Sequence, residues 1–384
     1  MATSLVARAP VPVGRADASP RRRHVAHLGL AAIVLVAGLA WPVHTEFGRT
    51  AHAEQELGPV SDGHAVVSPD AADARNRRQA SRPIAARQPL APVPPVDQRD
   101  APDPFVLADG DRYVLYSTQV GFHNVPVAAS QDLRKWSEPS DALPVLPTWA
   151  GWGRTWAPGA MPFGDGYVLY FTSYHQRSGR QCIGVAASPT ADGPFTSSAA
   201  EPLVCQTHLG GSIDPYPFRQ PDGTPFLLWK ADGNAIGQSS TLFAQGLSAD
   251  GLALVGEPAA LITSGAAWEQ PLIENPAMVV ADQSFVLLYS GGWWESDGYA
   301  IGYATCDTPL GPCTKASVAG PLLASGGDEA GPGGACVVTG PAGDQWLAYH
   351  AWTAGAVGYT QSGGVRSLRF AALTWRGAEP VVAR

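Results

Sequence analysis

The stretch YVLYST at residues 113–118 is a short run of aromatic and aliphatic residues, and four similar runs follow it in the chain. They read YVLYFTS from 167, PFLLWKA from 225, FVLLYSG from 285 and QWLAYHA from 345. Each aromatic anchor lies 54, 59, 59 or 61 residues after the one before it: Tyr113, Tyr167, Phe226, Phe285 and Trp346. Runs of this composition predict β-strands, and their regular spacing predicts a repeat architecture.

An element that contains proline precedes each run, and most runs are followed by a third strand that ends in small residues, as in CIGVAAS. The proline elements read APDPFV, WAPGAM, SIDPYP, IENPAM and AGPGGA. Five such units without convincing amphipathic helices predict an all-β fold, the five-bladed β-propeller, in which each small sheet buries both faces against its neighbours. The first strand of each blade is expected to line a central channel, where the proline elements converge.

The chain before the repeats has a different composition. Three arginines at 21–23 precede an apolar run at residues 28–41, and Ala51-His52-Ala53 offers a cleavage site, so residues 1–53 are predicted to be a signal peptide. An uncleaved membrane anchor formed by residues 28–41 is the alternative. Residues 54–96 are rich in Pro and Ala and are predicted to form a disordered linker. Residues 97–384 are predicted to form the propeller of a secreted or extracellular protein, and anchoring at the cell membrane is the alternative.

The charge and the cysteines agree with that location. Residues 97–384 contain 14 Lys and Arg against 26 Asp and Glu, and this negative charge argues against a nucleic-acid partner. We expect a monomer. All five cysteines lie after residue 181, and we expect the pairs Cys306–Cys313 and Cys182–Cys205, which leave Cys336 free.

Three acidic residues of the proline elements are candidates for chemistry. Asp103, Asp214 and Glu274 belong to blades one, three and four and are expected at matching repeat positions, near one end of the channel. Carboxyl groups gathered in one place repel each other, so a functional reason is expected. The alternative is that each Asp bonds a turn amide. Glycoside hydrolysis needs one protonated and one ionised carboxyl group in a shared pocket.

The chain from about 101 to 375 resembles glycoside hydrolase family 43. The resemblance rests on these three acids, on WAP at 156–158, on GPGG at 331–334 and on the closing RSLRFAALTW. The resemblance implies inverting enzymes that act on arabinose- and xylose-containing plant polysaccharides. It implies that Asp103 is the general base, that Glu274 is the general acid, and that Asp214 orients the acid and tunes its pKa. The sequence departs from the family at Gly159, where an acidic residue is frequent, which puts a sugar contact in question.

The resemblance also implies a structural calcium in the central channel, the one cofactor expected, and His350 is the candidate residue that holds the ion or a water bound to it. A histidine satisfied within the core is the alternative, and calcium prefers oxygen ligands. Arg366 or Arg369 is expected to approach the carboxylates, and Arg366 is our candidate for the substrate site.

Aromatic residues near the blade strands are candidates for stacking on sugar rings: Phe122, Trp152, Trp156, Trp293 and Trp294, with His123 beside the first of them. Packing between blades is the alternative. Because consecutive side chains of an extended segment point opposite ways, at most one of Trp293 and Trp294 is expected to face the pocket.

The sequence therefore predicts an exported inverting glycosidase of the α-L-arabinofuranosidase or β-xylosidase type, with arabinan, arabinoxylan or xylan-derived sugars as partners. Three alternatives remain: an endo-arabinanase, a fructan-cleaving propeller enzyme, and a non-catalytic carbohydrate-binding propeller. The fructan-cleaving class typically carries Asn-Asp-Pro, Arg-Asp-Pro and Glu-Cys elements, where this chain has Pro102-Asp103-Pro104, Ile213-Asp214-Pro215 and Glu274-Asn275.

Overall fold

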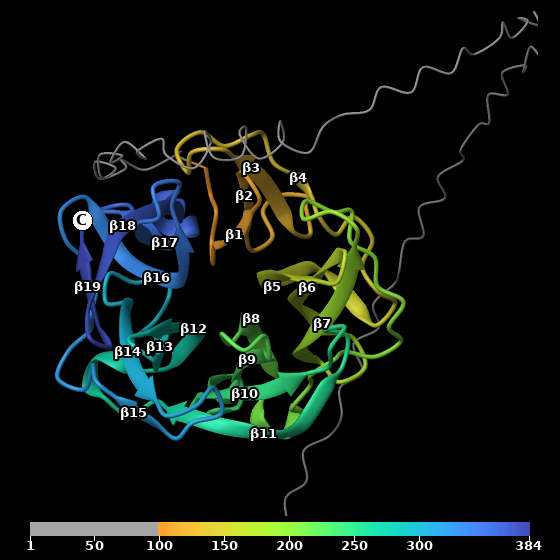
Figure 1. Cartoon of the computed structure of the whole chain (residues 1–384). Coiled ribbons are helices and arrows are strands. Elements are labelled where there is room, and N and C mark those ends of the chain that lie inside the picture. The colour runs from red at the N-terminus through yellow and green to blue at the C-terminus, as the bar shows by residue number, and fades with distance from the viewer. Residues whose placement is uncertain (1–98) are drawn as a thin grey trace, which may run out of the picture. The chain divides into compact units, whose positions relative to one another are not determined.

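A computed structural model describes residues 99–384, and it shows five antiparallel sheets arranged around a central channel (Figure 1). The prediction of an all-β, five-bladed propeller is confirmed. The predicted signal or anchor region and the predicted linker lie outside the described residues. Within residues 99–384, no helix has the length and apolar character needed to cross a bilayer.

In each blade the strands follow chain order from the channel outward. Blade one contains β1 (Phe105–Asp109), β2 (Arg112–Tyr116), β3 (Pro126–Ser130) and β4 (Ser140–Asp141). Blade two contains β5 (Ala150–Phe163), β6 (Gly166–His175) and β7 (Arg180–Ser188). Blade three contains β8 (Ser212–Arg219), β9 (Pro225–Ala231), β10 (Thr241–Leu247) and β11 (Leu254–Thr263). Blade four contains β12 (Ile273–Ala281), β13 (Ser284–Gly291), β14 (Ala300–Cys306) and β15 (Cys313–Lys315). Blade five contains β16 (Glu329–Thr339), β17 (Gln345–Thr353), β18 (Ser367–Arg376) and β19 (Glu379–Ala383).

Helical segments in the described part of the chain are short: η1 (Thr207–Leu209), η2 (Gly233–Ile236), η3 (Ala267–Glu269) and α2 (Tyr359–Ser362). The five runs that predicted the repeat are the second strands, β2, β6, β9, β13 and β17. The expected disulfides, Cys182–Cys205 and Cys306–Cys313, are both present, and Cys336 is free and buried.

The hydrophobic core lies between the blades. Buried side chains form five clusters, and each cluster joins two neighbouring blades, including blade five with blade one. The ring closes where the Ala101 N–H donates to the Arg366 carbonyl at 2.9 Å. Every sheet buries both faces, so the large apolar residues of the second strands alternate between the two neighbouring blades. Their burial stabilises the ring of blades.

In every blade a residue with a left-handed backbone conformation lies at the channel, within the first strand or, in blade one, two residues before it. The φ angles are 51° for Asp103, 40° for Ala157, 56° for Asp214, 49° for Asn275 and 63° for Gly334. In blades two to five a register shift accompanies this residue. Proline follows it in the first four blades and has no N–H for the ladder, so the strand bends and the N–H of the left-handed residue turns toward the neighbouring blade.

This ring of left-handed residues corrects the repeat alignment. The blade-four counterpart of Asp103 and Asp214 is Asn275, so Glu274 stands one residue earlier, at the position of Ile213. In blade five both Gly331 and Gly334 have a left-handed backbone, with φ of 56° and 63°. The counterpart is Gly334, because its neighbour Gly333 pairs with His350 and its N–H donates to Ser290 Oγ. Alignment on proline selects Gly331 and is wrong there, because the property that repeats is the position opposite the second strand, which Gly334 occupies without a following proline.

Candidate active site

Four of the five left-handed residues donate their N–H to a side chain of the preceding blade. The acceptors are Thr118 Oγ1 for Ala157 (2.8 Å), Thr172 Oγ1 for Asp214 (3.0 Å), Ser290 Oγ for Gly334 (3.0 Å) and His350 Nδ1 for Asp103 (3.0 Å). Each acceptor comes from the second strand of its blade or directly follows that strand. The channel is therefore lined by a repeated hydrogen bond that links one blade to the next.

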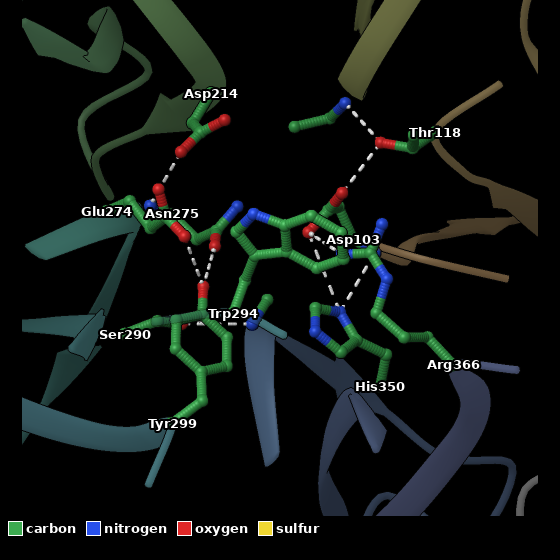
Figure 2. Close-up of polar contacts among 12 residues, drawn as sticks. Asp103, Thr118, Asp214, Glu274, Asn275, Ser290, Trp294, Tyr299, His350 and Arg366 are labelled. Carbon is green, nitrogen blue, oxygen red and sulfur yellow. Dashed lines mark hydrogen bonds and ion pairs between the residues drawn. The ribbon is translucent and has the colours of Figure 1, made fainter. Parts of the chain in front are cut away.

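The repeated hydrogen bond is replaced at the junction between blades three and four. Lys230 of β9 stands at the acceptor position, opposite Ile213, and an ammonium group has no lone pair to accept an N–H. The Asn275 N–H instead donates to Asp214 Oδ2 at 3.0 Å. Asp214 is thereby turned toward blade four, beside Glu274 (Figure 2).

Asp103, Asp214 and Glu274 all line one cleft of about 540 Å³ at the channel. The structure thus brings together the three acids that the sequence singled out, although 171 residues separate the first from the last. Figure 2 shows Asp103 beside His350 and Arg366, with Asp214 and Glu274 on the other side of the site. The expectation that they gather around one pocket is confirmed.

Asp103 has surroundings that favour its ionised form. The Thr118 hydroxyl donates to Asp103 Oδ2 at 2.7 Å, and Arg366 Nη1 lies 3.5 Å from Asp103 Oδ1. Burial by itself raises the pKa of this carboxyl, but the Arg366 charge and the hydrogen bonds outweigh burial and lower its pKa below the usual value. An ionised, oriented carboxylate is what a general base requires.

Asp214 has the opposite surroundings. Burial and the neighbouring Glu274 raise its pKa well above the usual value, and Asp103 adds to the effect. The Lys230 charge and the Asn275 N–H oppose this shift but do not reverse it. In the sugar-free site Asp214 therefore holds a proton at a pH where Asp103 has lost its own.

Glu274 contacts a cation and a hydroxyl group. Lys230 Nζ lies 2.9 Å from Glu274 Oε2, and the Tyr299 hydroxyl donates to Glu274 Oε1 at 2.8 Å. Tyr299 reaches this position because it lies against Gly333, where an added Cβ would stand 1.9 Å from the Tyr299 ring. Lys230 of blade three and Tyr299 of blade four thus orient Glu274, and Gly333 of blade five leaves room for the Tyr299 ring.

Two of the candidate tryptophans correct an expectation. Trp293 and Trp294 both line the cleft, with ring centroids 6.0 Å apart. The prediction that at most one faces the pocket is wrong, because residues 292–299 form a turn between β13 and β14 instead of an extended strand. Trp156 of β5 also lines the cleft, as expected.

The arginine of the site is Arg366, which lines the cleft with its guanidinium 4.8 Å from the Trp294 ring. Arg369 instead pairs with the exposed Asp328, at 3.8 Å. Gly159 is packed under the channel, where an added Cβ would stand 2.7 Å from Pro217. An acidic side chain has no room at that position, so the departure from the family pattern removes no side chain from this cleft.

Phe122 does not line the cleft, contrary to expectation. It is 87% exposed and stacks on Trp152, which is also exposed. Val120 and His123 bridge across a tight turn, so Phe122 sits at its tip and points to solvent, while Gly121 borders the cleft. His123 lines a separate apolar pocket beside Trp136.

The surroundings of His350 do not suit direct binding of calcium. His350 is fully buried, and the Arg366 charge together with burial lowers its pKa to about 3, so the ring is neutral. Since Nδ1 accepts the Asp103 N–H, the ring proton resides on Nε2, which has no lone pair for a metal and no hydrogen-bond partner. An oxygen acceptor such as water fits this N–H, and a calcium held through water stays a prediction.

Within residues 99–384, one cluster has metal-ligand spacing, His175 with Cys182 and Cys205, and its cysteines are bridged to each other. Sequence reasoning missed the polar residues that orient the acids: Thr118, Lys230, Asp232, Asn275 and Tyr299. A signal for Lys230 was present, because it is the charged residue within the apolar run PFLLWKA.

Comparison with known proteins places the chain among carbohydrate enzymes. Residues 93–378 match the family described as glycosyl hydrolases family 43. The chain is 29% identical over 189 residues to the β-D-galactofuranosidase xynD of Aspergillus niger, covering 48% of this chain and 50% of that protein. It is 28% identical over 140 residues to an extracellular endo-α-(1→5)-L-arabinanase of Thermotoga petrophila, covering 32% and 27%. These matches span at most half of either relative.

Among solved structures, the chain is similar to a thermostable family-43 glycoside hydrolase, with a TM-score of 0.66 and 28% identity. The match covers 74% of this chain and 92% of that one.

Proposed function

This chain belongs to glycosyl hydrolases family 43, and we propose that it is an exported, inverting glycosidase acting on arabinose- or xylose-containing plant polysaccharides or their oligosaccharides. The observation that carries the proposal is the pair of opposed environments in one cleft. The pKa of Asp103 is lowered, whereas burial and the neighbouring Glu274 raise the pKa of Asp214, and all three acids line the same cleft. Hydrolysis with inversion needs a base and an acid in this relation.

In the proposed reaction, Asp103 removes a proton from a water molecule, whose oxygen attacks the anomeric carbon of the bound sugar. Glu274 gives its proton to the glycosidic oxygen, and the bond between that oxygen and the anomeric carbon breaks. The products are a sugar of inverted configuration and an alcohol, and the two carboxyl groups have exchanged protonation states. Asp214, bonded to the Asn275 N–H, orients the acid side of the site.

The sugar is proposed to bind against the aromatic wall formed by Trp156, Trp293 and Trp294, since aromatic faces stack on the apolar faces of sugar rings. Arg366 lies between this wall and Asp103 and can donate to a ring hydroxyl as well as to the carboxylate. The curated relatives are named for galactofuranose and arabinan substrates, so a furanose ring is included among the sugars proposed for this cleft.

The test uses aryl α-L-arabinofuranosides, β-D-xylosides and β-D-galactofuranosides, with proton magnetic resonance of the first-formed anomer. We expect cleavage of at least one of them with inversion. We expect rate losses of about 100-fold or more for Asp103→Asn, and for Glu274→Gln on a poor leaving group. Near wild-type rates in both variants would refute the assignment of roles. Sugar binding by calorimetry without any turnover would favour a non-catalytic binding propeller.

An endo-acting arabinanase is the second candidate, supported by the similarity to the Thermotoga petrophila protein. Product analysis on linear arabinan and arabinoxylan separates the two. Monosaccharide as the sole product means action at chain ends, whereas a ladder of oligomers means internal cleavage. Detection of the protein in the culture medium, or in the membrane fraction if residues 28–41 anchor it, tests the proposed export.

A further inference from the structure

Lys230 is a buried cation at the one channel junction where the repeated hydrogen bond is replaced. Its side chain is 1% exposed, and it comes from β9, where the neighbouring residues are apolar. Nζ lies 2.9 Å from Glu274 Oε2 and 3.0 Å from Asp232 Oδ1. A lysine is almost never this buried without a specific partner, and here it has two carboxylates.

Lys230 is the cation nearest to Glu274, and several other polar and charged groups surround this carboxyl group. Asp214 approaches from β8, the Tyr299 hydroxyl bonds Glu274 from the loop before β14, and the charge of Asp103 acts from across the site. Among the described residues that line the cleft, the second cation is Arg366, and it faces Asp103. Lys230 is therefore the cation that faces Glu274.

This arrangement stabilises the carboxylate form of Glu274, because one oxygen faces an ammonium group. The other oxygen lies 2.8 Å from the Tyr299 hydroxyl, whose one proton is shared with Asn275 Oδ1 at 2.7 Å. Glu274 passes through that form during the reaction, since it becomes negative as its proton moves to the leaving oxygen. A fixed cation 2.9 Å away is aligned with the charge that develops. The same cation makes Glu274 harder to protonate beforehand, and Asp232 offsets part of that effect by taking a share of the lysine charge.

We propose that Lys230 is a positioning residue for the acid step: it holds and stabilises the Glu274 carboxylate, and Asp232 sets how strongly it does so. This inference rests on the proposed role of Glu274 as general acid. It predicts that removing either partner changes the pH range of activity, in opposite directions. A residue that only filled space would have no such signature.

The experiment compares Lys230→Met and Asp232→Asn by the pH dependence of kcat/KM on whichever aryl glycoside the parent cleaves. Lys230→Met removes the positive charge that faces the Glu274 carboxylate, so the basic limb should move up by about one pH unit. Loss of the Asp232 charge leaves Lys230 wholly to Glu274, so the basic limb of Asp232→Asn should move down by several tenths of a unit or more. If the basic limbs of the two variants stay in place, or if both move in the same direction, the inference is wrong.

A second readout uses the leaving group. A dinitrophenyl leaving group departs without protonation, so the rate loss of Lys230→Met should be about tenfold or more on a phenyl glycoside and should largely vanish on the dinitrophenyl glycoside. An equal loss on both substrates would mean that Lys230 acts on sugar binding or on folding, and would also overturn the inference. Lys230→Arg, which keeps the charge, should retain a basic limb close to that of the parent.

The matched control is Lys315→Met. Lys315 forms another lysine–glutamate pair with a buried carboxyl group, 2.6 Å from Glu269, outside the cleft. Its loss should lower the melting temperature without moving either limb. Asp232→Asn, which removes no cation, keeps the inference testable if Lys230→Met does not fold. If Glu274→Gln keeps wild-type activity on the phenyl glycoside, the proposed function is wrong. If Glu274→Gln loses activity but the basic limbs of Lys230→Met and Asp232→Asn do not move, only this inference is wrong.

Discussion

Asp103 and Asp214 occupy equivalent positions in their blades, but their pKa values are shifted in opposite directions. Both have a left-handed backbone, with φ of 51° and 56°, both precede proline, and both donate their N–H to a side chain of the preceding blade. Yet the pKa of Asp103 is lowered and that of Asp214 is raised. The repeat therefore sets the position of each carboxyl group, and the neighbouring side chains set the direction of its pKa shift.

The neighbours differ because each blade contributes different side chains to the same ring positions. Asp103 faces Arg366 at 3.5 Å, whereas the cation near Asp214, Lys230, makes its short contacts with Glu274 and Asp232. Asp214 is thus left with a second carboxyl group beside it and no cation of its own.

The largest effect is expected from replacing each aspartate by asparagine. Asp103→Asn removes the ionised base and should lower kcat by about 10³- to 10⁴-fold. Asp214→Asn replaces a group that is already neutral in the sugar-free site, so its loss should be at least about tenfold smaller. Equal losses in steady-state kinetics would show that Asp214 acts in its ionised form and would remove the contrast.

Arg366→Met should make the site of Asp103 more like that of Asp214. Without the guanidinium, the pKa of Asp103 rises, so activity at low pH is lost sooner and the acid limb of kcat/KM should move up by about 1 to 2 pH units. Arg219→Met removes an exposed arginine that lies over Phe163, away from the cleft, and serves as the control with an unmoved limb. An unmoved limb in Arg366→Met would contradict the proposed source of the shift.

The two threonines of the ring form a matched pair. Thr118→Val and Thr172→Val each remove the acceptor of one backbone N–H, of Ala157 and Asp214 respectively, and each should lower the free energy of unfolding by about 1 to 2 kcal/mol. Only Thr118 also donates to Asp103, so only Thr118→Val should raise the acid limb. Denaturant unfolding and pH profiles of both variants check this, and a limb shift in Thr172→Val would count against it.

Near neutral pH the smallest effect on stability is expected from His350, because the titration of this ring contributes only at lower pH. Its pKa is lowered from 6.5 to about 3, so between these values the unfolded chain binds the extra proton and the free energy of unfolding falls as the pH is lowered. His350→Gln keeps an acceptor for the Asp103 N–H but loses the titration, so its stability should fall less steeply, by at most about 1.4 kcal/mol per pH unit. Melting temperatures from pH 7 to 4 measure the difference, and parallel curves would refute it.

Much of the fold was predictable because its signals are local. The apolar second strands and the Asp-Pro pairs recur at a nearly constant spacing, and no distant contact is needed to recognise them. The placement of Glu274 and of blade five was less accurate, because Glu274 stands one residue before the left-handed Asn275 and because the blade-five counterpart, Gly334, is not followed by proline. Trp293 and Trp294 were misjudged for the same kind of reason, since a turn cannot be told from an extended segment by two aromatic residues.

The number of blades and the three acids that meet could be predicted from the chain, because a period and a turn pair are properties of neighbouring residues. The protonation of these acids required the folded arrangement. That depends on which cation lies within a few ångströms of which carboxyl group, and Arg366 and Lys230 reach theirs across 263 and 44 residues of chain. Coulomb interactions fall with distance in space, and no spacing along the chain reports that distance.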